Sequence, residues 1–234
     1  MNDRVKGYTI RPDKEVRSVR LANALSALRR ILGGDRFSGL VSSIKQTIQS
    51  LRISNPKMLD YGCGAMGLSQ ALLKDGVVAD FVGMDIFPSP AKTGEDAELW
   101  ARYRQIPISG NLPVHERYNV AIIVDALHHA DESQHVRILE SVALVADFVI
   151  VKDHFEYGPI SRQLLRLADA YGNFAFGVNV PARYFTQKRW ADTVNRAGLT
   201  QTVLKIGVPI HQGLFRFVIR PKFHFIAILQ KPQA

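Results

Sequence analysis

The sequence has little cysteine and no long apolar run. Cys63 is the single cysteine, so the chain cannot form an internal disulfide, and no Cys/His group has the spacing of a zinc site. The most apolar stretches, such as 118–127, fall short of the roughly 18 to 20 residues that a membrane-spanning helix needs. The first seven residues, Met-Asn-Asp-Arg-Val-Lys-Gly, lack the apolar segment of an export signal. We therefore expect a cytoplasmic protein without a structural metal.

The sequence also lacks a run of like charges, although it is basic overall. Its 30 Lys and Arg residues outnumber its 21 Asp and Glu residues, which gives a formal net charge of +9. Such a charge favours anionic partners, among them phosphorylated metabolites, anionic lipid surfaces and nucleic acid. The basic residues are scattered, however, as on a solubilising surface. Charge alone therefore selects no partner.

Apolar residues follow helical or strand spacing along the chain, and no repeat or linker marks a domain boundary. Hydrophobic residues make up 47% of the sequence, which is enough to bury one core. Two sets of apolar residues predict two amphipathic helices before the first strand: Leu21, Leu25, Leu28 and Leu32, then Leu40, Ile44, Ile48 and Leu51. We expect a single domain over residues 1–234, with a helical extension over 1–55 and a catalytic core over 56–234.

Segments rich in Val and Ile then alternate with amphipathic segments. The predicted elements are strands over 57–61, 77–85, 118–124 and 145–152, helices over 67–74 and around Leu139, and a final strand pair over 202–208 and 223–229. Thr186 is the predicted N-cap of a further helix, which ends at Gly198. This order indicates an α/β, Rossmann-like, mostly parallel sheet with helices on both faces and an antiparallel C-terminal edge strand pair, preceded by N-terminal helices.

A glycine-rich turn follows the first predicted strand. Gly62 and Gly64 lie where a strand ends and a helix begins, which is where backbone approaches a ligand closely and helix N–H groups are free. With Gly67 they also match the dinucleotide fingerprint, and Asp85 ends the next strand, where either type of cofactor would have its ribose bound. Asp60 favours S-adenosylmethionine, because its carboxylate would repel a pyrophosphate but balance an amino acid ammonium.

Three segments together resemble the motif series of class I S-adenosylmethionine-dependent methyltransferases: Met58-Leu59-Asp60-Tyr61-Gly62-Cys63-Gly64, Val82-Gly83-Met84-Asp85, and Tyr118 to His129. The resemblance covers residues 56 to 155. Within the family, the chain is similar to bacterial enzymes of the ubiquinone and menaquinone methyltransferase type. Where that family usually has another glycine two residues after Gly64, this chain has Met66, so a slightly different turn is expected.

The resemblance implies a set of cofactor-binding residues. Asp60, Gly62 and Gly64 would surround the methionine part of the cofactor, Asp85 its ribose and Asn111 its adenine. The full set that it implies is Asp60, Tyr61, Gly62, Cys63, Gly64, Asp85, Ile86, Asn111, Asp125 and Ala126. The cofactor would be S-adenosyl-L-methionine and the product S-adenosyl-L-homocysteine.

Titratable side chains follow two strands of the predicted sheet, where ligands of α/β proteins bind. Methyl transfer needs two positioned reactants and, for a weak nucleophile, a base. His154 is our first candidate for that base and His128 the second, although a His pair at 128–129 also suits a cap of the strand-to-helix turn. Two histidines with Asp125 and Asp153 could hold a metal, but no ligand spacing supports this, and we expect none.

Residues 155–185 combine aromatic side chains with glycines. They predict a lid over an apolar acceptor, with Asn173 as an orienting amide, although core packing explains the same aromatics equally well. Three basic residues further on could hold an anionic end of the acceptor: Arg216, Arg220 and Lys222. The expected acceptor is a small molecule or lipid precursor, methylated at oxygen or carbon.

Three other functions stay open at this point. The spacing Tyr184-x-x-x-Lys188 is that of short-chain nicotinamide oxidoreductases, although here it precedes a predicted helix and the glycine turn comes late in the chain. A pI of about 9.8 suggests a nucleic-acid methyltransferase, but Asp125-Ala126-Leu127-His128 stands where enzymes acting on base amino groups carry Asn/Asp-Pro-Pro-aromatic. A non-catalytic cofactor-binding protein is the third.

Overall fold

The computed structural model of the chain describes residues 36–88, 97–107, 112, 116–173, 180–211, 213 and 215–232, and the side chains of all of these except 171–173 and 215. The predicted helix at Leu21 to Leu32 lies outside these residues. So do Asn111 and the side chain of Asn173, as well as part of the predicted lid. None of the described helices has the length and apolar character needed to cross a bilayer.

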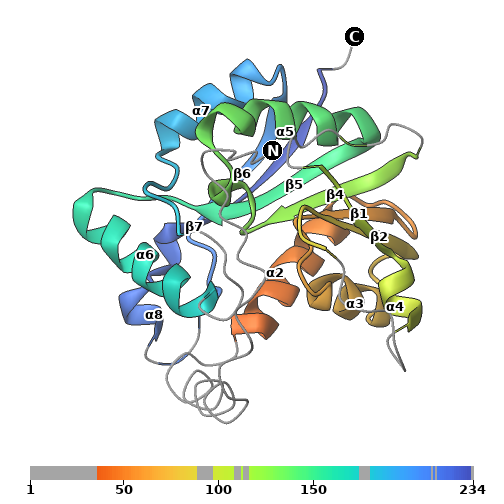
Figure 1. Cartoon of the computed structure of the whole chain (residues 1–234), viewed down its shortest axis with the longest axis horizontal. Helices are drawn as coiled ribbons and strands as arrows, with labels where there is room; N and C mark the ends of the chain where they lie inside the picture. Colours follow the sequence, from red (N-terminus) through yellow and green to blue (C-terminus); the bar gives the residue numbers. More distant parts are fainter. Residues whose placement is uncertain are drawn as a thin grey trace, which may run out of the picture.

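The described residues form one seven-stranded sheet in the order β3-β2-β1-β4-β5-β7-β6 (Figure 1). Its strands are β1 (Lys57–Tyr61), β2 (Asp80–Asp85), β3 (Tyr103–Gln105), β4 (Tyr118–Val124), β5 (Ala146–His154), β6 (Thr200–Ile206) and β7 (His224–Gln230). Strands β1 to β5 pair in parallel, whereas β7 runs antiparallel to both β5 and β6. The predicted mostly parallel sheet with an antiparallel C-terminal pair is confirmed.

Helices cover both faces of the sheet. Figure 1 shows α5 (Glu132–Val145) and α7 (Gln187–Arg196) over one face, and α2 (Arg36–Ser50), α3 (Gly67–Lys74) and α4 (Ala97–Ala101) over the other. α6 (Pro159–Asn173) and α8 (Phe215–Val218) lie beyond the end of β5. Two short 3-10 turns complete the described elements, η2 (Leu127–His129) and η3 (Pro221–Phe223).

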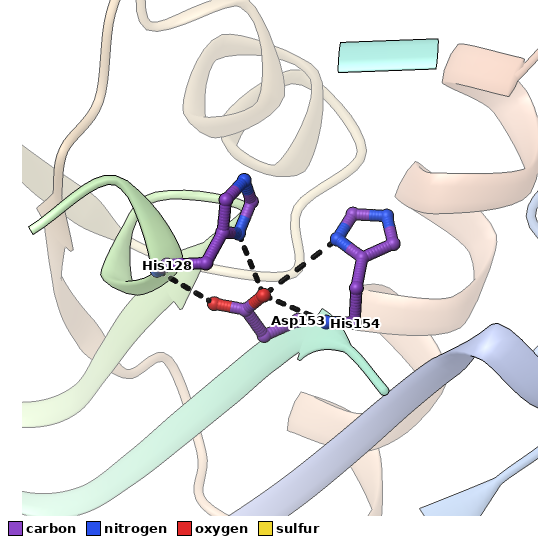
Figure 2. Close-up of side chains that lie close together, drawn as sticks. All are labelled: His128, Asp153 and His154. Atoms are coloured by element: carbon purple, nitrogen blue, oxygen red, sulfur yellow. Dashed lines mark hydrogen bonds and ion pairs between the residues drawn. The ribbon is translucent and has the colours of Figure 1, made fainter. Parts of the chain in front are cut away.

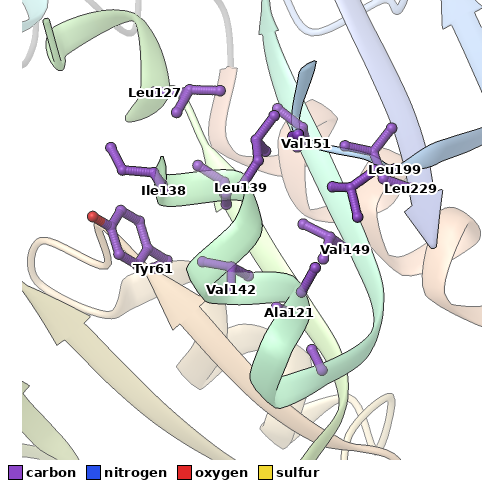
Figure 3. Packing of buried hydrophobic residues seen from close by; sticks show 14 of the residues in the cluster. Tyr61, Ala121, Leu127, Ile138, Leu139, Val142, Val149, Val151, Leu199 and Leu229 are labelled. Atoms are coloured by element: carbon purple, nitrogen blue, oxygen red, sulfur yellow. The ribbon is translucent and has the colours of Figure 1, made fainter. Parts of the chain in front are cut away.

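The central strands are apolar on both sides, because helices cover both faces. Along β4, Val120 and Ile122 belong to the cluster under α2 and α3, whereas Ala121 and Ile123 belong to the cluster under α5 and α7. All four side chains are fully buried. This alternation follows from the two-residue period of a strand. Figure 3 shows the second cluster, in which Leu139 and Val142 of α5 meet the sheet.

Several predicted boundaries were wrong. β2 begins at Asp80 rather than residue 77, β5 ends at His154 rather than 152, and β6 occupies Thr200–Ile206 rather than 202–208. β3, α4 and α6 were not predicted as elements; β3 is a three-residue strand with only Tyr103 buried, and α4 has only five residues. The predicted cap of α7 is correct: Thr186 Oγ1 accepts a hydrogen bond from Arg189 N at 3.2 Å.

Candidate functional site

The glycine-rich turn joins β1 to α3. Gly62 has a φ of 74°, and a Cβ there would lie 2.5 Å from Cβ of Ala126, so neither the backbone nor the space admits a larger residue. Gly64 has a φ of 51°, and no described atom lies within 4 Å of the place of its Cβ. Gly62 N donates to Met84 O at 2.7 Å, which ties the turn to β2. The turn therefore presents open backbone at the carboxyl end of β1.

Met66 stands where the resembled family usually has glycine. It adopts the left-handed conformation, with φ of 57°, which costs a non-glycine residue about 1–2 kcal/mol. Its side chain is fully buried against Gly83, where a Cβ would lie 2.6 Å from Met66 Sδ and 2.8 Å from Cys63 Sγ. The turn thus differs from that of the resembled family in the strained backbone of Met66. Burial of the Met66 side chain offsets the free-energy cost of this strain.

Asp60 places a carboxylate directly under the turn. It is 3% exposed, and its Oδ2 accepts a hydrogen bond from Ser69 Oγ of α3 at 2.5 Å. Burial raises the pKa of Asp60 to about 7, against the lowering effect of the Ser69 hydrogen bond, and the nearby charge of Asp85 raises it further. The single hydrogen bond from Ser69 does not offset the burial of this carboxylate, so a cation bound beside it would be stabilising.

Asp85 connects two loops at the end of β2. Its Oδ2 accepts from Gly64 N at 2.8 Å and its Oδ1 from Phe87 N at 3.2 Å. Each carboxylate oxygen can accept more than one hydrogen bond, so both can still receive hydroxyl donors. Asp85 therefore shapes the glycine turn and also offers acceptors beside it.

A cavity of about 340 Å³ opens on the turn. Its lining comes from α2, the ends of β1 and β4, and the turn itself: Arg36, Phe37, Leu40, Asp60, Gly62, Cys63, Leu68, Val124 and Asp125. Four of the predicted cofactor residues, Asp60, Gly62, Cys63 and Asp125, are thus brought together. Arg36, Phe37 and Leu40 were not predicted as site residues, because their helix precedes every motif.

Asp125 is held at the end of β4 by two cations. Its Oδ1 accepts from Lys152 Nζ at 2.5 Å and its Oδ2 from Arg36 at 2.6 Å. Burial opposes the charge of Asp125, but Lys152, His154 and Arg36 outweigh it and hold its pKa well below the usual value. Its φ of 50° is strained for a non-glycine residue. The backbone and both ion pairs therefore fix this carboxylate at the mouth of the cavity.

The other predicted cofactor residues lie around the turn. Tyr61 is buried in the core cluster under α5, and Ile86 and Ala126 pack partly buried against the same cluster. Burial, with the nearby carboxylates Asp60 and Asp85, raises the pKa of the Cys63 thiol, so this thiol is neutral. These residues would therefore contact a ligand through backbone groups rather than through their side chains.

A second group of titratable side chains lies at the ends of β4 and β5 (Figure 2). Asp153 Oδ1 lies 2.6 Å from His128 Nδ1 and accepts from His154 N at 2.6 Å, while its Oδ2 accepts from His128 N at 3.2 Å. His154 Nδ1 lies 3.6 Å from Asp153 Oδ1 and 3.4 Å from Asp125 Oδ1. Both predicted bases are therefore brought together, and His154 also adjoins the cavity through Asp125.

The two histidines differ in charge. Burial opposes a charge on His128, but Asp153 and Asp169 outweigh it and raise the pKa to about 10. Burial lowers the pKa of His154, and the charge of Lys152 lowers it further against the opposite effect of Asp125. At neutral pH His128 is therefore an imidazolium, whereas His154 is a neutral imidazole that can accept a proton.

α6 completes the surroundings of His128. Asp169 Oδ2 lies 3.2 Å from His128 Nε2 and accepts from Tyr184 Oη at 2.9 Å. Tyr184 is 2% exposed, and its burial, with Asp169, raises its pKa above the ordinary value. Lys188 is exposed at the start of α7. Tyr184 is thus a partner of Asp169, which is not the arrangement that an oxidoreductase Tyr-Lys pair needs.

The cluster also has the donors of a metal site. Ligand atoms of His128, Asp153 and His154 lie within 4.8 Å of one another, as do those of His128, His129 and Asp169. His128 Nδ1 and Asp153 Oδ1, however, are already joined at hydrogen-bond distance. The geometry is accounted for by an imidazolium between two carboxylates.

Sequence reasoning missed the residues that meet this cluster from distant segments. Lys152 is fully buried, and its role as partner of Asp125 depends on the alignment of β4 and β5. His224 of β7 lies beside His154, with ring centroids 4.9 Å apart, and His211 lies 5.2 Å beyond His224. No local sequence motif predicts these contacts. The predicted pairing of the C-terminal strands was the one signal that could have placed His224 near the end of β5.

Comparisons with known proteins come from structure alone, since no family model and no curated protein matches the sequence. A S-adenosylmethionine-dependent methyltransferase from Clostridium acetobutylicum is similar with a TM-score of 0.59 and 10% identity, over 91% of this chain and 100% of that one. The 1,6-didemethyltoxoflavin-N1-methyltransferase of Burkholderia thailandensis, solved with its substrate and S-adenosylhomocysteine, has a TM-score of 0.57 and 16% identity, over 94% and 93%.

A further similar structure is longer. The pyocyanin biosynthetic protein PhzM has a TM-score of 0.56 and 15% identity over 80% of this chain, which spans 54% of the length of PhzM. The methyltransferases share with this chain the fold expected from the three motif segments. The resemblance is therefore confirmed at the level of architecture: this chain has the fold of class I S-adenosylmethionine-dependent methyltransferases.

Proposed function

We propose that the protein transfers a methyl group from S-adenosyl-L-methionine to a small molecule or lipid precursor, at oxygen or carbon. The observation that carries this is a buried, desolvated carboxylate, Asp60, beneath an open glycine turn in a methyltransferase fold. S-adenosylmethionine carries both an ammonium for that carboxylate and ribose hydroxyls for Asp85. When bound, it supplies a methyl group on a positively charged sulfur.

The residues at the turn fit this cofactor. Gly62 and Gly64 leave the backbone of the turn accessible, and Asp125 presents a carboxylate at the mouth of the same cavity. Asp60 and Asp125 would therefore bind and orient the cationic amino acid part. The apolar side chains of Phe37 and Leu40 would exclude water from it.

We propose that His154 removes the proton of the methyl acceptor. His154 is neutral and buried, and its Nδ1 faces the carboxylates of Asp125 and Asp153 at 3.4 Å and 3.6 Å, so Nε2 would be the atom that accepts the proton. It lies beside Asp125 and thus next to the cavity. Asp153, which accepts from His154 N, would hold its backbone in place. His128, already charged and held by two carboxylates, would position that network.

The basic residues expected to hold an anionic acceptor lie elsewhere. Arg216, Arg220 and Lys222 are exposed around α8 and η3, and none of them lines the cavity. The cations beside the cavity are Arg36 and Lys152 instead. We propose that these two, rather than the exposed set, set the charge preference of the acceptor site.

Three alternatives are weaker. A nicotinamide oxidoreductase would place a pyrophosphate near Asp60 and needs Tyr184 as an acid, which its bond to Asp169 opposes. A nucleic-acid methyltransferase has only the net charge in its favour. A non-catalytic binder leaves the buried histidines unexplained. Binding of NADPH but not of S-adenosylmethionine would favour the oxidoreductase. A salt-sensitive complex that shows no turnover would favour the non-catalytic binder.

Cofactor affinity is expected to fall as the pH is lowered through about 7. Asp60 has a raised pKa of about 7 in the free protein, so below that pH it is protonated and must lose a proton to pair with the ammonium. Each lower pH unit then costs up to about tenfold in affinity. Calorimetry with S-adenosylhomocysteine between acidic and neutral pH measures this. Asp60→Asn should bind more weakly and without this pH dependence. A wild-type affinity that is flat over this range would contradict the assignment.

Replacing Asp85 by Ala is expected to weaken S-adenosylhomocysteine binding by about 1–3 kcal/mol, because ribose hydroxyls and Gly64 N lose their acceptor. Calorimetry at constant pH gives the value, and a thermal melt of each variant separates lost binding from lost folding. Asp75→Ala is the control, because this exposed carboxylate pairs only with Lys45 across the surface. Unchanged affinity in Asp85→Ala would remove Asp85 from the cofactor site.

A further inference from the structure

The three most exposed large apolar side chains in the described part of the chain lie on two neighbouring helices. Ile160 and Leu167 of α6 are 80% and 67% exposed, and Phe217 of α8 is 63% exposed. Tyr157 and Val218 beside them are about half exposed. These five residues form what we call the α6–α8 patch. Such a concentration of exposed apolar surface marks an interaction site.

The outward face of α6 carries two large apolar side chains, Ile160 and Leu167, with the polar Gln163 between them. Its exposed positions recur at helical spacing, and they are Ile160, Gln163, Leu167 and Ala170. The opposite face carries Leu165, which is 2% exposed. α6 is therefore apolar on two faces, of which only one is used inside the protein.

A small core joins the segments that carry α6 and α8. Leu165 of α6 packs with Ile219, which follows α8, and with Phe223, while Tyr157 Oη donates to Lys222 O at 3.1 Å. Figure 1 shows the two helices together at one end of the molecule. The exposed side chains of both helices therefore lie at the same end of the protein.

The surroundings of the patch are basic. Three exposed basic residues, Arg216, Arg220 and Lys222, lie in or next to α8 and η3, and residues 193–234 contain no acidic residue. The guanidinium of Arg216 lies 4.8 Å from the ring of Phe217, and Lys222 Nζ lies 5.3 Å from the ring of Tyr157. Glu156, which precedes α6, accepts two hydrogen bonds from Arg162 of α6, so its charge is compensated. Exposed cations thus border the apolar side chains directly.

We infer that the α6–α8 patch docks on an anionic lipid surface. Interfacial helices combine a protruding apolar face with Lys and Arg at the level of the headgroups, and anionic lipids attract those cations. The exposed side chains of the patch would enter the interface, while Arg216, Arg220 and Lys222 would contact lipid phosphates.

Charge argues for lipid over a second copy of the chain. A two-fold symmetric contact through the patch would bring the same basic residues together, which like-charge repulsion opposes. The side chains of Ile160, Leu167 and Phe217 are 63–80% exposed, whereas side chains that line a peptide-binding groove are partly enclosed. An anionic lipid surface attracts the basic residues and also accepts exposed apolar side chains without a groove.

The inner side of α6 borders the candidate site, because Asp169 lies 3.2 Å from His128 Nε2. Docking would therefore place the histidine cluster close to the membrane, which suits an acceptor carried in the lipid phase. This last step rests on the proposed methyltransferase function, but the docking itself does not.

Vesicle co-sedimentation of the full chain tests the inference. We expect binding to phosphatidylcholine vesicles that contain phosphatidylglycerol, and much weaker binding to pure phosphatidylcholine. Leu167→Ser and Phe217→Ser should each weaken binding by about tenfold, because each removes a large apolar side chain from the interface. Substituting Gln at Arg216, Arg220 and Lys222 together should abolish the preference for phosphatidylglycerol and the sensitivity to salt.

Matched variants elsewhere serve as controls. Leu144→Ser on α5 removes an apolar side chain that is 48% exposed, and Arg196→Gln removes an exposed charge of the same segment, so both should bind as wild type does. Equal loss in Leu144→Ser and Leu167→Ser would overturn the inference, as would equal binding to both vesicle types. So would a dimer in sedimentation velocity that Leu167→Ser dissociates.

The two proposals fail separately. S-adenosylhomocysteine affinity should be unchanged in Leu167→Ser, since this residue is remote from the cavity lining. A protein that binds vesicles but not S-adenosylhomocysteine would refute the methyltransferase proposal alone. One that binds S-adenosylhomocysteine but not anionic vesicles would refute the docking alone.

Discussion

Turnover in His154→Ala is expected to fall by about 10² to 10⁴, with S-adenosylhomocysteine affinity unchanged, because general base catalysis acts on the acceptor's proton and not on cofactor binding. The assay is methyl transfer from labelled cofactor into fractionated cell extract. His129→Ala, a neighbouring histidine whose side chain is 15% exposed, is the matched control and should keep most of the rate.

The pH profile separates the two histidines. The pKa of His154 is lowered from 6.5, so with His154 as the base kcat at saturating cofactor rises on an acid limb below pH 6.5 and is level at neutral pH. With His128 as the base, the rate would keep rising towards pH 10, because its imidazolium loses its proton only there. A profile of the second kind, or a His154→Ala variant with a near wild-type rate, would remove His154 from this role.

Lys152→Met is expected to lower the free energy of unfolding by about 3–5 kcal/mol, which is the usual effect of removing one partner from a buried ion pair. Lys152 is fully buried, and its Nζ donates to Asp125 at 2.5 Å. Urea unfolding measures the loss. Pairing Lys152→Met with Asp125→Asn should recover part of it, because the carboxylate that Arg36 alone would then compensate no longer carries a charge.

An exposed ion pair provides the comparison. Arg117 and Asp147 lie 3.0 Å apart, with side chains 67% and 49% exposed. Arg117→Met should lower stability by no more than about 1 kcal/mol, because solvent screens such a pair. If Lys152→Met cost as little as Arg117→Met, the Lys152–Asp125 pair would not stabilise the site.

Local patterns predicted the parts of the site that one segment makes alone. Gly62, Gly64 and Asp60 lie within a single strand and turn. Their spacing in the sequence therefore already places the Asp60 carboxylate next to the glycine turn. Asp85 ends β2 and Asp125 directly follows β4, the two strands that flank β1, and parallel strands bring their carboxyl ends to one edge. The sequence therefore predicted the fold class and which residues meet at the turn, whereas their binding of the cofactor stays a prediction.

The acceptor side depends on contacts between distant segments. Asp169 reaches His128 only because α6 turns back over the end of β5, and His224 reaches His154 only through the β5–β7 register. No spacing in the sequence reports such encounters. α6 itself was missed as a helix because its segment was interpreted as a lid from its aromatic residues and glycines, although Ile160, Leu164 and Leu167 follow helical spacing.

Strand order has a consequence for how the chain reaches this structure. β5 is interior to the sheet only because β7, from far along the chain, pairs with it: Ile150 with Ile228 and Lys152 with Ile226. Before that pairing forms, Val149, Ile150 and Val151 present an apolar edge with free backbone groups, and such an edge recruits other chains. Closing a long loop is slow because its entropy cost comes before any contact is gained. Aggregation should therefore compete with folding at this step, so folding yield should depend more on protein concentration than final stability does.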